Sequence, residues 1–225
     1  MSALGNKPLL YLITDRQKLT ASLQGLEADG QQYDIRIERL TQLAARAAEV
    51  GIDLIQVREK DLTGRQILSL VEQIAQAARP LGARILVNDR YDVAIAAGAD
   101  GVHLTTQSLP VKAVRKLAGD RFLIGASTHS IAEVREAEDG GADFVVFGPV
   151  FDTPSKRQFG PPVGLGALSN AVKQTSLPVL AIGGINLENF GSVLECGAAG
   201  IAAISMFAEI ESLEEVVARI RAKHG

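Results

Sequence analysis

The sequence has little that would tie it to an oxidising compartment or to a membrane. Cys196 is its only cysteine, so an internal disulfide is excluded, and this cysteine usage fits a reducing compartment. The N-terminus lacks the charged and then apolar pattern of a secretory signal peptide, and no apolar run is long enough to span a bilayer. We therefore expect a cytoplasmic protein.

An excess of positive charge is also missing. The formal net charge is -3 and the isoelectric point is about 5.7, which argues against a general surface for nucleic acid or anionic membranes. Any anion site must therefore be local, and we expect small-molecule substrates as partners. The length of 225 residues suits one domain with a large core. The oligomeric state stays open, and a homo-oligomer is compatible with the sequence.

What the chain does contain is a series of apolar runs that each end in a polar, charged or glycine-containing cluster. In a parallel α/β barrel the carboxyl ends of the strands converge on one face, where the active sites of this fold lie. Residues far apart in sequence would then line one pocket. The clusters are Gln56 to Lys60, Asn88-Asp89-Arg90, Ser127-Thr128-His129, Gly148-Pro149, Gly183-Gly184 and Ile204-Ser205.

Small-residue junctions mark the opposite end of several runs, as in Gly51-Ile52-Asp53, Gly98-Ala99-Asp100, Gly141-Ala142-Asp143 and Gly197-Ala198-Ala199-Gly200. Glycine there closes a helix before a tight turn into a strand. The near-continuous hydrophobicity of the runs is typical of a parallel sheet that is buried on both faces. Since strand and helix patterns alternate about eight times, the sequence predicts a (β/α)8 TIM barrel, α/β in class, as one domain over residues 1–225.

The predicted strands and helices can be given by residue. The strands are Leu9 to Thr14, Leu54 to Arg58, Ile85 to Asn88, Gly101 to Leu104, Phe122 to Ala126, Phe144 to Gly148, Val179 to Ile182 and Ile201 to Ser205. The helices include Arg39 to Val50, Gly64 to Arg79, Val111 to Ala118, Ile131 to Asp139, Leu187 to Glu195 and Ser212 to Lys223. Two segments interrupt the rhythm: 16–37 is a predicted loop insertion after the first strand, and 149–165 carries glycine, proline, hydroxyls and two cations, which indicates a loop over an anionic ligand.

Phosphate chemistry is indicated at the last two strand ends. Loops after strands seven and eight of such barrels often bind phosphate through backbone N–H groups. Gly184 allows the backbone to approach an anion closely, and Ser205 adds a hydroxyl. The alternative is that the glycines only turn the chain.

The second and third strand ends carry the charged candidates. Alternation sends Arg58 and Lys60 to one side and Glu59 to the other, so the two cations suit a second phosphate group, unless they are solvated surface charges. Asp89 is an oxygen ligand of the kind that Mg²⁺ accepts, or else a helix N-cap. His129 is the best candidate to titrate near neutrality, whereas a strand histidine such as His103 is more often a hydrogen-bonded packing residue.

Taken in order along nearly the whole chain except segment 16–37, these motifs resemble the thiamine phosphate synthase and thiazole tautomerase superfamily, with the synthase branch nearer. The motifs that carry the resemblance are Tyr11 to Asp15, Gln56 to Lys60, Asn88-Asp89-Arg90, Gly98 to Leu104, Ser127 to Ser130, Gly148 to Phe151, Ala181 to Ile185 and Ile204-Ser205.

The resemblance implies a Mg²⁺-dependent transferase. It would condense 4-amino-5-hydroxymethyl-2-methylpyrimidine diphosphate with a thiazole phosphate, releasing diphosphate and giving thiamine phosphate. By match to the motifs, the pyrimidine diphosphate would be bound by Gln56, Val57, Arg58, Glu59, Lys60, Asn88, Ser127 and Lys156. The thiazole phosphate would be bound by Thr153, Pro154, Ser155, Gly184, Ile204 and Ser205. Asp89 would bind Mg²⁺, and Arg58, Lys60, Ser127 and Lys156 would act on the leaving diphosphate.

One departure from the family pattern bears on the metal. Ser108 stands where the synthase usually has a second aspartate ligand, and a hydroxyl binds Mg²⁺ more weakly than a carboxylate. Two alternatives therefore stay open: a metal-independent thiazole tautomerase that uses His129 as its base, and a non-catalytic protein that binds thiamine phosphate. Asp89 and Lys60, which the tautomerase branch commonly loses, are both present and favour the synthase.

Overall fold

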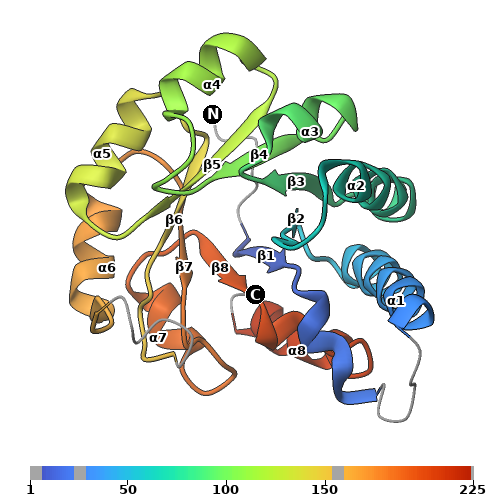
Figure 1. Cartoon of the computed structure of the whole chain (residues 1–225). Helices are drawn as coiled ribbons and strands as arrows, with labels where there is room; N and C mark the ends of the chain where they lie inside the picture. The colour runs from blue at the N-terminus through green and yellow to red at the C-terminus, as the bar shows by residue number, and fades with distance from the viewer. Residues whose placement is uncertain (1–6, 23–28, 154–159, 224–225) are drawn as a thin grey trace.

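The computed structural model describes residues 7–22, 29–153 and 160–223. It contains a closed barrel of parallel strands in sequential order from β1 to β8, with helices packed around the outside (Figure 1). The predicted TIM barrel is therefore confirmed. The strands are β1 Leu9–Ile13, β2 Leu54–Val57, β3 Arg84–Asn88, β4 Gly101–Leu104, β5 Leu123–Thr128, β6 Phe144–Phe147, β7 Val179–Ile182 and β8 Gly200–Ala203.

The helices follow the strands in alternation. The α-helices are α1 Asp29–Glu49, α2 Gly64–Ala78, α3 Tyr91–Ala96, α4 Val111–Ala118, α5 Ile131–Asp139, α6 Gly164–Lys173, α7 Phe190–Glu195 and α8 Leu213–Ala222. Short 3-10 helices are η1 Arg16–Ser22, η2 Arg79–Leu81 and η4 Ser205–Phe207. None of the helices in the described ranges is long and apolar enough to cross a membrane.

The segment 16–37 is not a loop along its described length, which corrects that prediction. It contains η1 and, from Asp29 on, the N-terminal part of α1. The apolar pattern that reveals a helix begins only near Ile37, which is buried against the barrel. Before Ile37 the sequence is polar and contains glycine, so it reads as a loop.

The barrel closes because its first strand pairs on both sides. Tyr11 is opposite Leu54 of β2 and Ala202 of β8. Alternate residues then point inward and form a separate core inside the barrel, while the outward residues pack beneath the helices. The inner core consists of Leu9, Tyr11, Ile13, Leu54, Leu86, Leu123, Phe144, Val146, Leu180 and Ala202.

Aspartates in the Gly-x-Asp junctions fasten the N-terminal end of the barrel. Each accepts a hydrogen bond from a strand N–H: Leu10 to Asp53 at 2.9 Å, Ile85 to Asp100 at 2.8 Å and Ile124 to Asp143 at 2.7 Å. Each also pairs with an arginine that donates to the carbonyl of the junction glycine, namely Arg221 on Gly51, Arg79 on Gly98 and Arg115 on Gly141. The junctions noticed in the sequence are therefore stabilising features at the end of the barrel opposite the strand tips.

Candidate functional site

The predicted site residues lie at the carboxyl ends of the strands. Arg58 and Lys60 follow β2, Asn88 is the last residue of β3, and Ser127 is next to the last residue of β5. Gly184 follows β7, and Ile204 and Ser205 follow β8. Because all strands of the closed barrel are parallel, these residues share one face. Pro154, Ser155 and Lys156 lie outside the described residues.

Aromatic and polar side chains form the floor beneath this face. The ring of Tyr11 contacts Phe144 edge-on with centroids 5.6 Å apart, and it lies 5.8 Å from the ring of His103. The amide of Gln56 donates to the Tyr11 hydroxyl at 2.9 Å. Gly125 leaves room for these rings, since a Cβ there would lie 2.4 Å from Phe144 and 2.8 Å from His103. The floor is therefore closely packed.

His103 is held neutral in this floor and contacts Ser127. Its Nε2 atom lies 2.9 Å from the Ser127 Oγ, so the ring fixes the orientation of a hydroxyl at the mouth. Burial, and then the charge of Arg58, lower the pKa of His103 to about 3. Arg58 therefore places its positive charge close to the barrel interior. The interpretation of His103 as a hydrogen-bonded packing residue is confirmed.

Glu59 belongs to a buried network at the strand ends. Its carboxylate accepts hydrogen bonds from the Thr14 hydroxyl at 2.7 Å and from the Arg16 guanidinium at 3.0 Å. Arg16 also pairs with Asp61 at 2.6 Å. Burial raises the pKa of Glu59, against the opposing effect of these bonds. The carboxylate of Glu59 is thus bonded to Thr14 and Arg16 and forms no ion pair with Arg58 or Lys60.

The same network fixes the backbone of Arg58. Thr14 accepts a hydrogen bond from the N–H of Arg58 at 2.9 Å while it donates to Glu59. Arg58 is half-buried, and Lys60 is exposed. No carboxylate in the described part of the chain forms an ion pair with either cation, so both charges are available to an anion.

Asp89 and Lys60 line a cavity of about 400 Å³ together with Glu59, Asn88, Arg90, Thr105 and Gln107. Asp89 adopts φ 63°, a left-handed conformation uncommon for residues other than glycine and often found at functional sites. Its N–H donates to the carbonyl of His103 at 2.8 Å. Its carboxylate is exposed and has no hydrogen bond or ion pair to another described residue, since Arg90 pairs with Asp92 instead.

The oxygen atoms of Asp89 and Gln107 are of the kinds that bind magnesium. Mg²⁺ is usually bound by one or two carboxylates, with water and substrate phosphates completing an octahedron. Asp89 supplies one carboxylate, and Gln107 supplies an amide oxygen on the wall of the same cavity. The described residues contain no cluster of three or more carboxylate, histidine or cysteine ligands, so the protein alone offers a weak site that phosphate oxygens would have to complete.

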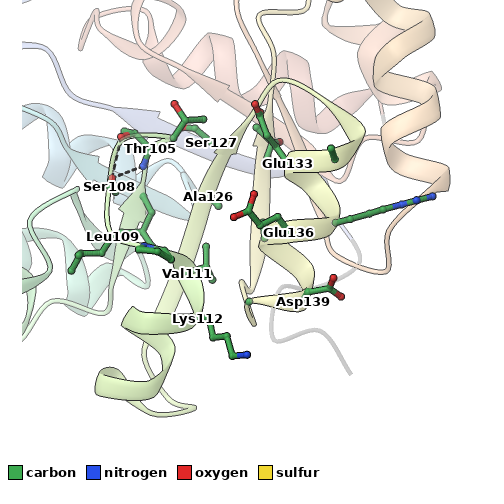
Figure 2. Close-up of a pocket in the computed structure, with 18 residues that line it drawn as sticks. Thr105, Ser108, Leu109, Val111, Lys112, Ala126, Ser127, Glu133, Glu136 and Asp139 are labelled. Carbon is green, nitrogen blue, oxygen red and sulfur yellow. Dashed lines mark hydrogen bonds between the residues drawn. The ribbon is translucent and has the colours of Figure 1, made fainter.

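Ser108 lines a cavity other than that of Asp89, although Thr105 lines both. Its hydroxyl accepts the N–H of Thr105 at 2.7 Å and lies 3.0 Å from the Thr105 hydroxyl, which makes it part of a tight turn. It lines a different cavity of about 880 Å³ between α4 and α5, with Ser127 and Glu136 (Figure 2). A joint metal site of Asp89 and Ser108 therefore stays a prediction.

The turn after β7 offers a backbone donor. Gly184 has φ 65°, and a Cβ there would lie 2.6 Å from the carbonyl oxygen of Asp152, so only glycine fits without a shift of the chain. Asn189 donates to the Gly184 carbonyl at 2.9 Å. Within residues 7–22, 29–153 and 160–223, no acceptor takes the N–H of Gly184. That N–H is a candidate donor to a phosphate, as is the exposed hydroxyl of Ser205.

His129 follows β5 and is exposed. Its Nδ1 atom hydrogen-bonds to the carbonyl oxygen of Gly148, so Nδ1 carries the proton of the neutral ring and Nε2 carries the lone pair. The backbone N–H of His129 donates to the Glu133 carboxylate. The ring is therefore held in a form that can accept a proton at Nε2.

Sequence reasoning missed Arg16 and Lys18, both in η1. Arg16 had a signal, because it follows the Thr14-Asp15 tip of the first strand as Arg58 follows that of the second. Lys18 had no such signal in the sequence. It is one polar residue in a polar segment, and its position depends on tertiary structure.

The family profile and the similar proteins all point to thiamine-phosphate synthases. The profile of a family described as "Thiamine monophosphate synthase" matches residues 29–207. A thiamine-phosphate synthase of Methanoculleus marisnigri is 48% identical over 165 residues, which cover 73% of this chain and 78% of the relative. One of Chlorobium luteolum is 43% identical over 180 residues, covering 80% and 85%.

A solved structure matches over almost the full length of both chains. The thiamine phosphate pyrophosphorylase of Pyrococcus furiosus superposes with a TM-score of 0.75 at 33% identity, covering 96% of this chain and 98% of that chain.

Proposed function

The chain belongs to the thiamine monophosphate synthase family, and from this premise we propose that it joins a pyrimidine methyl diphosphate to a thiazole phosphate. The C–O bond to diphosphate breaks, the thiazole nitrogen forms the new C–N bond, and diphosphate leaves with the electron pair of the broken bond. The products are thiamine phosphate and diphosphate. The protein is thus a transferase, and its cysteine usage favours action in the cytoplasm.

One observation carries this proposal: neither Arg58 nor Lys60 forms an ion pair with a carboxylate in the described part of the chain, and their neighbour Glu59 is bonded to Thr14 and Arg16 instead. A cation without an adjacent free carboxylate suits a departing diphosphate. Fixed charges that are already in place stabilise developing negative charge without reorganisation. Lys60, on the wall of the neighbouring cavity, adds a second charge, and Lys156 is proposed as a third.

The remaining predicted residues divide between the two substrates. Gln56, Val57, Asn88 and Ser127 are proposed to position the pyrimidine diphosphate at the tips of β2, β3 and β5. Thr153, Gly184, Ile204 and Ser205, with Pro154 and Ser155, are proposed to bind the thiazole phosphate near β6 to β8. Since the reacting groups must meet, binding from opposite sides of one mouth lowers the entropic part of the barrier.

Magnesium is proposed as the cofactor, held by Asp89. When bound, it would neutralise charge on the diphosphate. Gln107 shares the cavity with Asp89 and is the better-placed neutral oxygen donor, whereas the Ser108 hydroxyl is bonded to Thr105. Ser108 is retained as a ligand proposal that direct metal binding can test.

The test is product formation by the purified protein from both substrates with Mg²⁺. We expect thiamine phosphate and diphosphate in equal amounts, loss of product in EDTA, and a fall in kcat/KM of roughly 10²- to 10³-fold for Arg58→Met. Arg65→Met is the matched control, since Arg65 is an exposed arginine on α2, and it should keep wild-type activity. No thiamine phosphate under these conditions would remove the proposal.

A thiazole tautomerase is the second candidate, favoured by the fixed tautomer of His129. It predicts isomerisation of a carboxylated thiazole phosphate in EDTA, abolished by His129→Ala. If the synthase assay succeeds and this assay is silent, the second candidate is excluded.

A further inference from the structure

Segment η1 crosses from β1 toward the phosphate end of the site. Arg16 at its start is buried and donates to Glu59 at 3.0 Å and to Asp61 at 2.6 Å. The N–H of Lys18 donates to the carbonyl of Asp15 at 3.0 Å, which closes a turn directly after the strand. The start of η1 is thus fixed by a buried ionic network, and the position of Lys18 follows from it.

Lys18 reaches a residue at the far end of the chain. Its Nζ donates to the Ser205 Oγ at 3.2 Å. Ser205 directly follows the tip of β8, next to β1 in the closed barrel. In the described part of the chain no carboxylate forms an ion pair with Lys18, and the only partner recorded for its ammonium is a neutral hydroxyl. An unneutralised cation therefore lies beside a residue proposed to bind phosphate.

A phosphate bound at this end would otherwise receive only neutral donors. The Gly184 N–H, the Ser205 hydroxyl and Thr153 can direct hydrogen bonds to oxygen atoms, but none carries a formal charge. Hydrogen bonds from an ionised donor to phosphate are about twice as strong as those from neutral donors. The ammonium of Lys18 is the described group placed to provide one.

We propose that Lys18 is a further substrate-binding residue that neutralises the thiazole phosphate at Ser205 and makes the site selective for the phosphorylated thiazole over the free alcohol. This inference rests on the proposed synthase function. It also gives segment 16–22 a role: one network of Thr14, Glu59 and Arg16 binds the backbone N–H of Arg58 through Thr14 and fixes the start of η1, which carries Lys18, through Arg16.

The experiment measures steady-state kinetics for Lys18→Gln, which removes the charge and keeps a long polar side chain, and for Lys18→Arg, which keeps the charge. Lys116→Gln, a matched change of an exposed lysine on α4, is the control. For Lys18→Gln we expect the KM for thiazole phosphate to rise roughly 10-fold, the loss of one charge-assisted contact. The KM for pyrimidine diphosphate and the kcat should stay within about twofold of wild type.

The arginine variant and the control should both stay within about threefold of wild type in the KM for thiazole phosphate. The preference for thiazole phosphate over its alcohol should fall roughly 10-fold in Lys18→Gln alone. An unchanged KM for thiazole phosphate in Lys18→Gln would overturn the proposal, and so would an equal rise in both substrate KM values, because that marks a structural effect.

A failure of the synthase function is separable from a failure of this inference. If the wild-type protein forms no thiamine phosphate, calorimetry with inorganic phosphate still compares wild type with Lys18→Gln and Ser205→Ala. Weaker phosphate binding by both variants would support a phosphate site at Lys18 and Ser205 without the synthase activity. Equal binding by all three proteins would remove the inference as well.

Discussion

His103 has a neutral ring enclosed by the inner core of the barrel. Its side chain contacts Tyr11 and Phe144, its Nε2 bonds to Ser127, and its Nδ1 has no partner among the described residues. A protonated imidazole there would add a charge inside an apolar layer and close to Arg58. Both effects favour the neutral form, which keeps the hydrogen bond to the Ser127 hydroxyl intact at neutral pH.

This histidine predicts a pH dependence of stability. Its pKa is about 3 in the folded protein against 6.5 for the free side chain, so below pH 6.5 the unfolded chain binds a proton that the folded protein does not. Stability should therefore be complete above that pH and fall as the pH decreases toward 3, with a slope of up to about 1.4 kcal/mol per pH unit from this group.

Urea unfolding of wild type and His103→Gln between pH 4.5 and 7.5 measures this contribution. The variant should be less stable at pH 7.5, and its stability should fall less steeply toward pH 4.5. Other groups, including Glu59, titrate alike in both proteins, so the difference between the two curves isolates His103. Parallel curves would show that the ring does not resist protonation.

At the scale of elements, the Gly-x-Asp junctions predict graded losses of stability. Arg115 is largely buried and donates to the carbonyls of Gly141, Gly119 and Phe122 as well as to Asp143. Arg115→Met would leave these acceptors unpaired, at a cost of about 2 to 4 kcal/mol in the free energy of unfolding.

Arg79→Met is the matched comparison. Arg79 makes the same contacts to Asp100 and Gly98, but its side chain is 39% exposed, against 17% for Arg115. Water can replace its bonds, so we expect a cost below about 1 kcal/mol. Since both junctions lie at the end of the barrel opposite the strand tips, kcat of the folded fraction should not change. A lower kcat in either variant would show coupling across the barrel.

The elements also show what the sequence could and could not predict. The apolar runs and the small-residue junctions predicted all eight strands of the barrel, because buried parallel strands are apolar along their length. Helix α3 was anticipated only through the interpretation of Asp89 as a helix N-cap and received no bounds, because Tyr91–Ala96 is too short to show a helical period. The predicted fifth strand ended at Ala126 instead of Thr128, because Ser127 and Thr128 do not continue the apolar run.

The site shows the same division. Residues at strand ends, such as Arg58 and Asp89, were located by the strands that precede them. Alternation placed Glu59 on the side opposite Arg58 and Lys60, but it predicted neither the bond of Glu59 to Thr14 nor the bond of Ser108 to Thr105. Periodicity does not encode such contacts.

At the scale of the whole molecule, charge is divided between structure and site. The arginines that fix the barrel, such as Arg16, Arg115 and Arg221, are neutralised by carboxylates. Arg58, Lys60 and Lys18, at the mouth, have no carboxylate partner among the described residues. An acidic protein with a net charge of -3 can therefore still present positive potential at the mouth of the barrel.

Because the mouth is assembled from the ends of all the strands, a ligand bound there should stabilise the whole barrel. Diphosphate with Mg²⁺ at 100 times its dissociation constant would add about 2.7 kcal/mol, or roughly 5 to 10 °C in Tm for a protein of this size. EDTA should remove the part that depends on the metal. Differential scanning fluorimetry with diphosphate alone, with Mg²⁺ and with EDTA separates these contributions.

Variants at the proposed metal site test whether the Mg²⁺-dependent part of the Tm shift comes from Asp89. Asp89→Asn should abolish the Mg²⁺-dependent part of the Tm shift, because an amide oxygen attracts the ion less than a carboxylate. Ser108→Asp should enlarge the Mg²⁺-dependent Tm shift only if the side chain at position 108 reaches the ion. No enlargement would favour Gln107 over Ser108 as the neutral ligand. Asp120→Asn removes an exposed carboxylate beyond α4 and should behave as wild type. A Mg²⁺-dependent shift that survives Asp89→Asn would place the metal elsewhere.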